Sequence, residues 1–92
     1  MSYRLILNPR AQDDWQLWIR SGQQQIVNKI LNLFEELKEH PYTGTGQVEP
    51  LKGNFAGSYS RRINKQHRMV YKVEDNIVTV VVLRLRGHYN DK

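Results

Sequence analysis

The spacing of apolar residues changes once along the chain, and this change most constrains the fold. Over residues 9–39, apolar side chains recur every three or four positions, which indicates helices. From residue 48 onward they fall in short runs separated by hairpin-sized polar connections, which indicates antiparallel strands. The sequence therefore predicts an α+β fold, with two N-terminal helices packed on a mostly antiparallel sheet of four or five strands.

The ends of the two helices carry recognisable signals. A short strand is predicted at residues 3–7, after which Asn8 offers an N-cap oxygen and Pro9 takes the first helical position. Gly22 ends this helix, because glycine readily adopts the left-handed conformation of a helix terminus. The second helix is predicted at residues 23–39. So short a turn between them requires that the helices pack as an antiparallel hairpin or lie side by side on the sheet.

The second half of the chain reads as a loop followed by strands. Residues 41–47 contain two glycines and predict a mobile loop. Residues 48–52 contain Pro50, so this short segment belongs at an edge or a bend. Antiparallel strands are predicted at residues 58–63, 67–73 and 77–86.

The last strand is predicted to run from the core into a basic surface. Residues 77–83 are apolar on both faces apart from one threonine, which predicts a central position in the sheet. If the strand stays regular, Arg84, Arg86 and His88 point to one side because side chains alternate along a strand. One end of the sheet would then carry positive charge and end in a histidine.

Composition narrows the classes of function. The 92 residues form a single domain (1–92), with 14 Lys and Arg against 9 Asp and Glu and a net charge of +5. This excess favours nucleic acid or an acidic protein as partner. There is no cysteine and the three histidines lack ligand spacing, so neither a metal nor another cofactor is predicted. The longest apolar run is too short to span a bilayer, and we expect a cytoplasmic protein with no membrane contact.

Groups suited to cutting an RNA backbone gather in the second half of the chain. RNA carries its own nucleophile, the 2′-hydroxyl, so a nuclease needs a base, charge stabilisation at phosphorus and an acid for the leaving 5′-oxygen. Glu49 is a base candidate, His88 is an acid candidate, and arginines stand between them in sequence. Arg61 and Arg62 face opposite ways in a strand, so only one of them can join such a site, and we favour Arg62. Core packing, subunit contact or plain exposure is expected of the remaining rings: Trp15, Trp18, His40, Tyr59, His67 and Tyr71.

Four short motifs occur in a specific order. They read EPLK at 49–52, SRRI at 60–63, HRMVY at 67–71 and RGHY at 86–89. Together with the order of predicted elements, they resemble the RelE superfamily of toxins, and within it the YoeB/Txe branch. The resemblance covers nearly the whole chain.

The resemblance implies a function and assigns roles to residues. Proteins of this family are small bacterial toxins encoded beside an antitoxin, and they cleave mRNA in the ribosomal A site without metal. By motif, Glu49 takes the place of the general base, Arg68 of the phosphate-contacting arginine, and His88 of the general acid. Positions implied in RNA binding are Lys52, Arg62, Arg86 and Tyr89.

The implied partners are a cognate antitoxin protein, the ribosome with its mRNA, and a second copy of the chain in a homodimer. Two alternatives remain open at this point. One is a gyrase-directed toxin on the same scaffold, which needs no acid–base pair. The other is a non-catalytic partner that joins an antitoxin at DNA.

The chain departs from the family pattern at its end. It continues for three residues beyond the final tyrosine, over residues 90–92, whereas the family commonly ends at or near His-Tyr. The residue before the histidine is often aromatic in the family and is Gly87 here. A glycine at this position predicts a looser backbone where His88 must be held.

Overall fold

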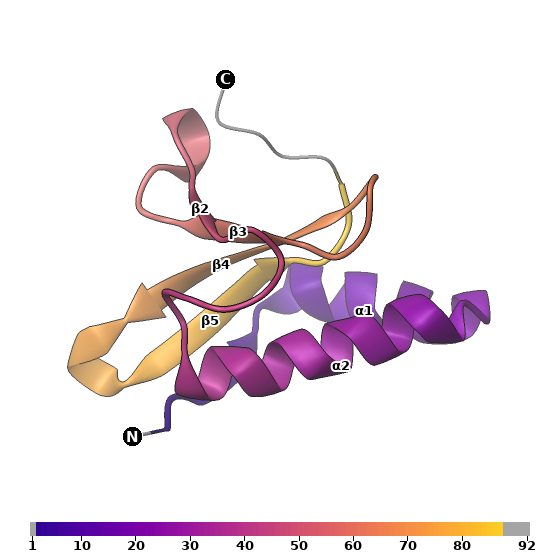
Figure 1. Ribbon diagram of the computed structural model, residues 1–92, viewed down its shortest axis with the longest axis horizontal. Helices are drawn as coiled ribbons and strands as arrows, with labels where there is room; N and C mark the ends of the chain where they lie inside the picture. Colours follow the sequence, from indigo (N-terminus) through magenta and orange to yellow (C-terminus); the bar gives the residue numbers. More distant parts are fainter. Residues whose placement is uncertain (1, 88–92) are drawn as a thin grey trace.

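The computed structural model describes residues 2–87 and shows two helices on one face of a five-stranded sheet (Figure 1). The elements in chain order are β1 (Arg4–Leu7), α1 (Pro9–Ser21), α2 (Gln24–Glu39), β2 (Glu49–Pro50), the 3₁₀ turn η1 (Gly53–Phe55), β3 (Tyr59–Arg62), β4 (Arg68–Glu74), the 3₁₀ turn η2 (Asp75–Ile77) and β5 (Thr79–Arg84). The predicted fold class is confirmed. Within residues 2–87, every helix is too short or too polar to cross a membrane.

The strand order in the sheet is β1-β5-β4-β3-β2. β1 pairs in parallel with β5, and the remaining neighbours pair antiparallel. β5 therefore lies inside the sheet, as its apolar composition predicted, and β2 forms the edge that Pro50 predicted. The parallel pairing of the first and last strands brings both halves of the chain into one sheet.

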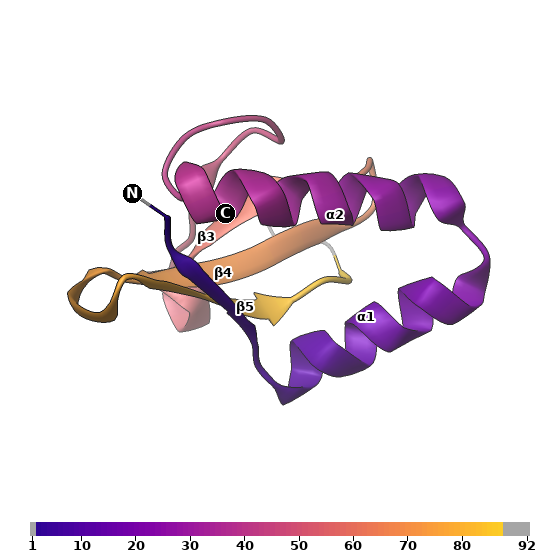
Figure 2. The ribbon, with the colours of Figure 1, turned by 90° about the horizontal axis from the view of Figure 1, so that it is seen from below.

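The helix ends follow the sequence signals. The side-chain Oδ1 of Asn8 accepts the Ala11 N–H over 2.9 Å, and Pro9 opens α1. Gly22 ends α1 with a φ of 76°, a conformation that glycine adopts without strain. The two helices lie side by side on one face of the sheet, which Figure 2 views from the helix side. Between the helices and the sheet lies one core: Ala11, Trp18, Ile30, Leu33, Phe34, Leu37, Ile63, Met69, Tyr71, Val80, Val82 and Leu85.

The last strand is shorter and less regular than predicted. Ile77 lies in η2 and is 64% exposed, so the strand begins only at Thr79. Tyr71 pairs with Val82 while its neighbour Val70 pairs with Arg84, which leaves one extra residue on β5. Such a bulge interrupts the alternation of side chains. The strand also ends at Arg84, and the expectation that Arg84 and Arg86 point to the same side is wrong: Arg84 lies over the Phe55 ring and Arg86 over the Trp18 ring. His88, the third residue of that expectation, lies outside the described residues.

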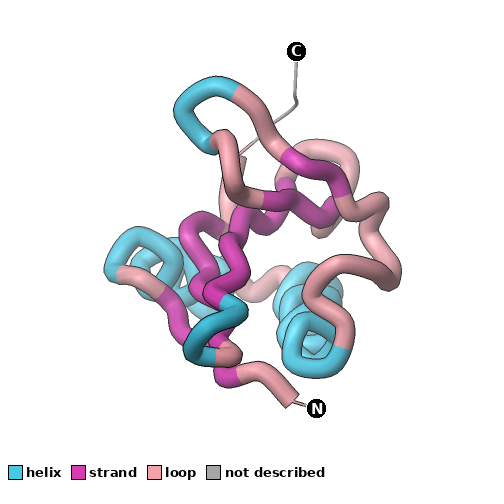
Figure 3. Tube along the Cα trace, turned by 90° about the vertical axis from the view of Figure 1, so that its left-hand side faces the viewer, coloured by secondary structure: helices cyan, strands magenta, loops and turns pink. Residues whose placement is uncertain are grey.

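The connection between α2 and β2 is anchored by arginines. Arg61 donates hydrogen bonds to the carbonyls of His40 and Thr43, and Arg68 donates to the carbonyl of Gln47. Figure 3 shows this connection as a loop that returns from the end of α2 to the sheet. These bonds argue against the mobility predicted from the glycines of residues 41–47.

Candidate active site

Arg68 is a buried cation held from two sides. It opens β4, and only 6% of its surface is exposed. Its Nε donates to Ser60 Oγ over 2.8 Å, and its Nη2 donates to the Gln47 carbonyl over 2.7 Å. Burial lowers the pKa of Arg68, Glu49 opposes that change and Arg62 adds to it. Arginine nevertheless stays protonated in proteins, so the structure fixes a positive charge here.

Glu49 stands beside that charge on the edge strand. β2 pairs with β3 so that Glu49 lies opposite Ser60, whose hydroxyl holds Arg68. Glu49 Oε1 is 3.9 Å from Arg68 Nη2, and 40% of the Glu49 side chain is exposed. This is an ion-pair distance rather than a hydrogen bond. The carboxylate is therefore oriented by the guanidinium while remaining open to a ligand.

The adjacent arginines of β3 face opposite ways, as predicted. Arg61 is fully buried on the helix side, where it bonds to Glu36 and Tyr71. Arg62 is exposed and lies directly opposite Arg68 in the β3–β4 register. Its charge is close enough to lower the pKa of Arg68. Arg62 thus extends the positive face on which Glu49 and Arg68 lie.

Lys52 lies close to Glu49 in sequence but is not tied to it. It is exposed and immediately precedes η1. Among residues 2–87, no hydrogen bond or ion pair joins Lys52 to Glu49 or Arg68. β2 and the segment after it rise on the side of the sheet away from the helices (Figure 1). The Arg84 guanidinium lies on this side too, 5.2 Å from the Phe55 ring.

Arg86 is directed elsewhere. Its guanidinium carbon is 5.8 Å from the centre of the Trp18 ring, so it lies against α1. Arg84 and Arg86 therefore diverge, because β5 ends at Arg84 and the strand alternation does not continue beyond it. In the described part of the chain, no ion pair or hydrogen bond links Arg86 to Glu49 or Arg68. The predicted residues His88 and Tyr89 lie outside the described residues.

Gly87, the last described residue, is bound at both of its main-chain polar groups. Its carbonyl accepts the Arg68 N–H over 2.9 Å, and its N–H donates to His67 Nδ1 over 3.0 Å. Its φ of 111° is a conformation that other residues rarely adopt. The glycine thus permits a specific backbone geometry here, and the looser backbone predicted at this position is not what the bonding shows.

Two buried side chains of α1 bind the residue after β5. Asp14 Oδ2 accepts the Leu85 N–H over 3.0 Å, and Trp18 Nε1 donates to the Leu85 carbonyl over 2.8 Å. The roles of Asp14 and Ser60 were not predicted from the sequence, and neither was the contact of His67 with Gly87. A signal was present for one of them: Asp14 falls on the same helical stripe as Ala11 and Trp18, where a carboxylate is out of place unless it is bonded.

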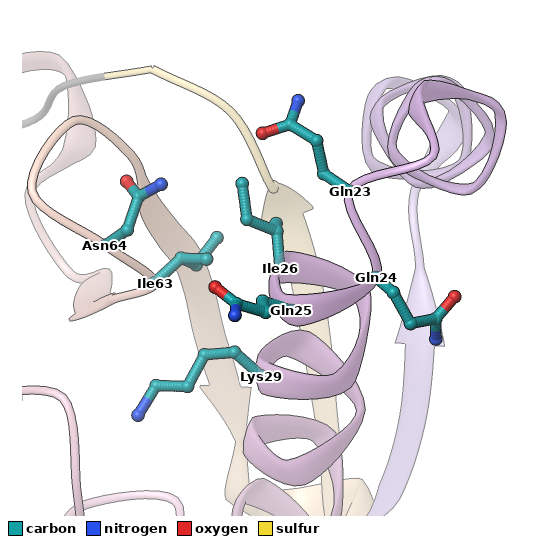
Figure 4. Close-up of a pocket in the computed structure, with 7 residues that line it drawn as sticks. All are labelled: Gln23, Gln24, Gln25, Ile26, Lys29, Ile63 and Asn64. Atoms are coloured by element: carbon teal, nitrogen blue, oxygen red, sulfur yellow. The ribbon is translucent and has the colours of Figure 1, made fainter.

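Two hollows lined by described residues lie away from Glu49. One of about 540 Å³ opens between the start of α2 and the β3–β4 hairpin (Figure 4). It is lined by Gln23, Gln24, Gln25, Ile26, Lys29, Ile63 and Asn64. A smaller one of about 240 Å³ is lined by Arg10, His67, Arg86 and Gly87. Within residues 2–87, no three His, Asp or Glu side chains gather as metal ligands would.

A family model matches the sequence of this chain. Its description is "YoeB-like toxin of bacterial type II toxin-antitoxin system", and it matches residues 7–89. The chain belongs to this YoeB family. It is therefore a type II toxin-antitoxin toxin by family, and the resemblance inferred from the four motifs is confirmed.

Relatives of the YoeB family agree in sequence and in structure. Toxin YoeB of Escherichia coli (strain K12) is 37% identical over 86 residues, which are 94% of this chain and 99% of the relative. The YoeB/ParE toxin from Agrobacterium tumefaciens has a TM-score of 0.86 at 38% identity, over 94% of this chain and 99% of that one. The YoeB dimer from Staphylococcus aureus has a TM-score of 0.82 at 31% identity, over 97% and 100%. The Staphylococcus aureus protein is also solved as a heterotetrameric YoeB-YefM toxin-antitoxin complex.

Proposed function

We propose that this YoeB-family toxin is a metal-independent endoribonuclease that cleaves mRNA in the ribosomal A site. One observation carries the proposal. The Glu49 carboxylate lies 3.9 Å from the Arg68 guanidinium, and the Arg68 main-chain N–H binds the carbonyl of Gly87, the residue that precedes His88. The carboxylate of Glu49, the guanidinium of Arg68 and the residue that precedes His88 in the chain therefore lie close together at one end of the sheet.

The chemistry follows from the residue types. Glu49 takes the proton of the 2′-hydroxyl, and the 2′-oxygen attacks the adjacent phosphorus. The bond from phosphorus to the 5′-oxygen breaks, and the imidazolium of His88 gives its proton to that leaving oxygen. The products are a 2′,3′-cyclic phosphate and a 5′-hydroxyl. Each correctly placed acid or base contributes roughly 10²–10⁴-fold to the rate.

Arg68 supplies the charge stabilisation in this scheme. Its hydrogen bonds to Ser60 and Gln47 hold the guanidinium in place before RNA binds. A donor fixed in advance needs no reorganisation as negative charge builds on the phosphate oxygens. We assign RNA-backbone contacts to Lys52, Arg62, Arg86 and Tyr89. Of these, Arg62 lies opposite Arg68, whereas Arg86 lies apart from it, over the Trp18 ring.

The ribosome has a physical role in the proposal. With a net charge of only +5, the domain gains limited affinity for free RNA at physiological salt. A ribosome that presents the message in the A site supplies the missing orientation. The reaction would take place in the cytoplasm, where translation occurs.

Proteins are the remaining partners. The Staphylococcus aureus relative is solved both as a dimer and in a complex with YefM. We infer that this chain likewise forms a homodimer and binds a cognate antitoxin. The antitoxin would need acidic residues to cover the positive face of Arg62 and Arg68.

Primer extension on a defined mRNA tests the activity. The message is incubated with purified toxin, with and without ribosomes, and the 5′ ends of the fragments are mapped. We expect cuts in the A-site codon only when ribosomes are present. Glu49→Ala and His88→Gln should abolish the cuts. Glu35→Ala is the matched control, because it removes a carboxylate that is 73% exposed on α2 and paired with Lys38.

Other outcomes would favour the alternatives. DNA damage on expression, with mRNA intact, would indicate a gyrase-directed toxin. A chain that binds its antitoxin but is not toxic, and whose binding is unchanged by Glu49→Ala and His88→Gln, would be a non-catalytic partner. If the His88→Gln variant cleaved mRNA at the wild-type rate, the assignment of His88 as the general acid would be wrong.

A further inference from the structure

The main chain just beyond β5 is held by a set of groups that the proposed chemistry does not use. Within the described residues, Leu85 donates to Asp14 and accepts from the Trp18 indole, while Gly87 donates to His67 and accepts from the Arg68 main-chain N–H. We call the side chains of Asp14, Trp18 and His67 the terminal clamp. They replace the strand ladder, which ends at the pairing of Val70 with Arg84.

The two residues of the clamp that lie on α1 are buried. Asp14 is 2% exposed and Trp18 is 5% exposed. A buried carboxylate is costly unless it is hydrogen-bonded, and Asp14 is satisfied by Leu85 and by Arg10 Nε at 3.3 Å. The Asp14 carboxylate and the Trp18 indole therefore hold Leu85 in a fixed position relative to α1.

His67 holds the other end of this segment. Its ring packs edge-on against Trp18, with centroids 4.9 Å apart, which limits rotation of the imidazole. Its Nδ1 accepts the Gly87 N–H, and a ring nitrogen can accept only when it carries no proton. In the neutral ring the proton therefore sits on Nε2. The lone pair of Nδ1 then fixes the direction in which the Gly87 N–H points.

We propose that His67 is a positioning residue for the catalytic histidine: its Nδ1 fixes Gly87, and through Gly87 the direction in which the chain enters His88. This inference rests on the proposed ribonuclease function. In this scheme His67 transfers no proton to or from the RNA, and its effect is geometric. Misplacing a reacting group by about 1 Å costs on the order of 10²-fold in rate.

Two substitutions at position 67 separate positioning from packing. Asn places its amide oxygen where Nδ1 stands, so His67→Asn keeps the acceptor. Leu fills similar space without an acceptor, so His67→Leu removes it. The full-length wild type and both variants are compared in three measurements: single-turnover cleavage on mRNA-programmed ribosomes, ribosome affinity, and exchange of the Gly87 amide proton by NMR.

The proposal predicts a specific pattern. His67→Leu should cleave roughly 10²-fold more slowly than wild type at unchanged ribosome affinity, and its Gly87 amide should exchange faster. His67→Asn should recover most of the rate and the slow exchange. Nitrogen-15 spectra of the wild type should show Nδ1 of His67 unprotonated and Nε2 protonated.

Three results would overturn the inference. One is a His67→Leu rate equal to wild type, and a second is a Gly87 amide that exchanges equally fast in all three proteins. The third is an equal loss of rate in both variants, because packing alone would then explain it. A wild type that cuts no RNA would instead refute the proposed function. The exchange and tautomer measurements would still decide whether His67 holds Gly87.

Discussion

The main-chain N–H of Arg68 donates to the carbonyl of Gly87 over 2.9 Å, while the side chain of the same arginine lies 3.9 Å from the Glu49 carboxylate. One buried residue thus connects the edge strand that carries Glu49 with the end of the chain that leads to His88. The Glu49 contact depends on the pairing of β4 with β3, and the Gly87 contact depends on the packing of β4 beside the end of β5. The site therefore depends on the placement of β4 between both of its neighbours.

Arg68→Lys tests the importance of guanidinium geometry. Lysine keeps the charge but cannot bond to Ser60 and Gln47 at once from a planar group. We expect cleavage on programmed ribosomes to fall by roughly 10²-fold, the scale of removing one oriented donor. Arg20→Lys is the matched control, since Arg20 is exposed in the last turn of α1 and has no assigned role in the site. Equal rates for Arg68→Lys and wild type would contradict this role.

The adjacent arginines of β3 should affect different properties. Arg61 is fully buried and bonded to Glu36, Tyr71 and the loop after α2, so Arg61→Ala should lower the free energy of unfolding by about 3 kcal/mol. Arg62→Ala should change that free energy by less than about 0.5 kcal/mol and slow cleavage instead. Urea denaturation of both variants, paired with cleavage assays, checks the contrast. Similar stabilities would show that the Arg61 contacts are dispensable.

Gly87→Ala tests the backbone that precedes His88. The φ of 111° at Gly87 is strained for alanine, at a cost of about 1–3 kcal/mol. Gly57→Ala is the control, because Gly57 has a φ of 89° with open space around its Cα. Both variants should lose similar stability in thermal melts, but only Gly87→Ala should lose cleavage. A fully active Gly87→Ala variant would show that this conformation is not required.

Asp75 predicts an acid-sensitive contribution to stability. It accepts hydrogen bonds from Tyr42 and Tyr3, and these bonds, the one from Tyr42 first, hold its pKa below the ordinary 3.8. Because the folded-state pKa is the lower one, the contribution is present above pH 3.8 and is lost as the pH falls through the folded-state value. Asp75→Asn should therefore be less stable than wild type at neutral pH, and the difference should shrink in acid. Denaturant midpoints measured across this range check it, and a constant difference would contradict it.

Much of the fold was readable from local signals. Asn8, Pro9 and Gly22 marked the ends of α1 because caps and terminators act through neighbouring main-chain groups. The interior position of β5 followed from its apolar run. The start of that strand was misplaced because Ile77, although apolar, lies in a 3₁₀ turn on the surface. A tendency to bury apolar side chains does not by itself decide where a hairpin turns.

The candidate residues of the site could be predicted from the sequence motifs, but the hydrogen bonds that hold them in place could not. Glu49, Arg62 and Arg68 were selected by residue type and motif, and the structure brings these three onto one face of the sheet. Their supporting groups could not be selected, because Asp14 and Ser60 matter only through partners distant in sequence.

The sequence alone determined the elements, their order and the residues suited to RNA chemistry, since these depend on spacing along the chain and on side-chain type. Only the tertiary structure decided that Arg68 contacts both Glu49 and Gly87. It also decided that the Arg84 and Arg86 side chains diverge at the end of β5. The reason is physical. Strand register and the residue at which a strand ends are set by packing over the whole domain, and shifting the register by one residue turns a side chain to the opposite face.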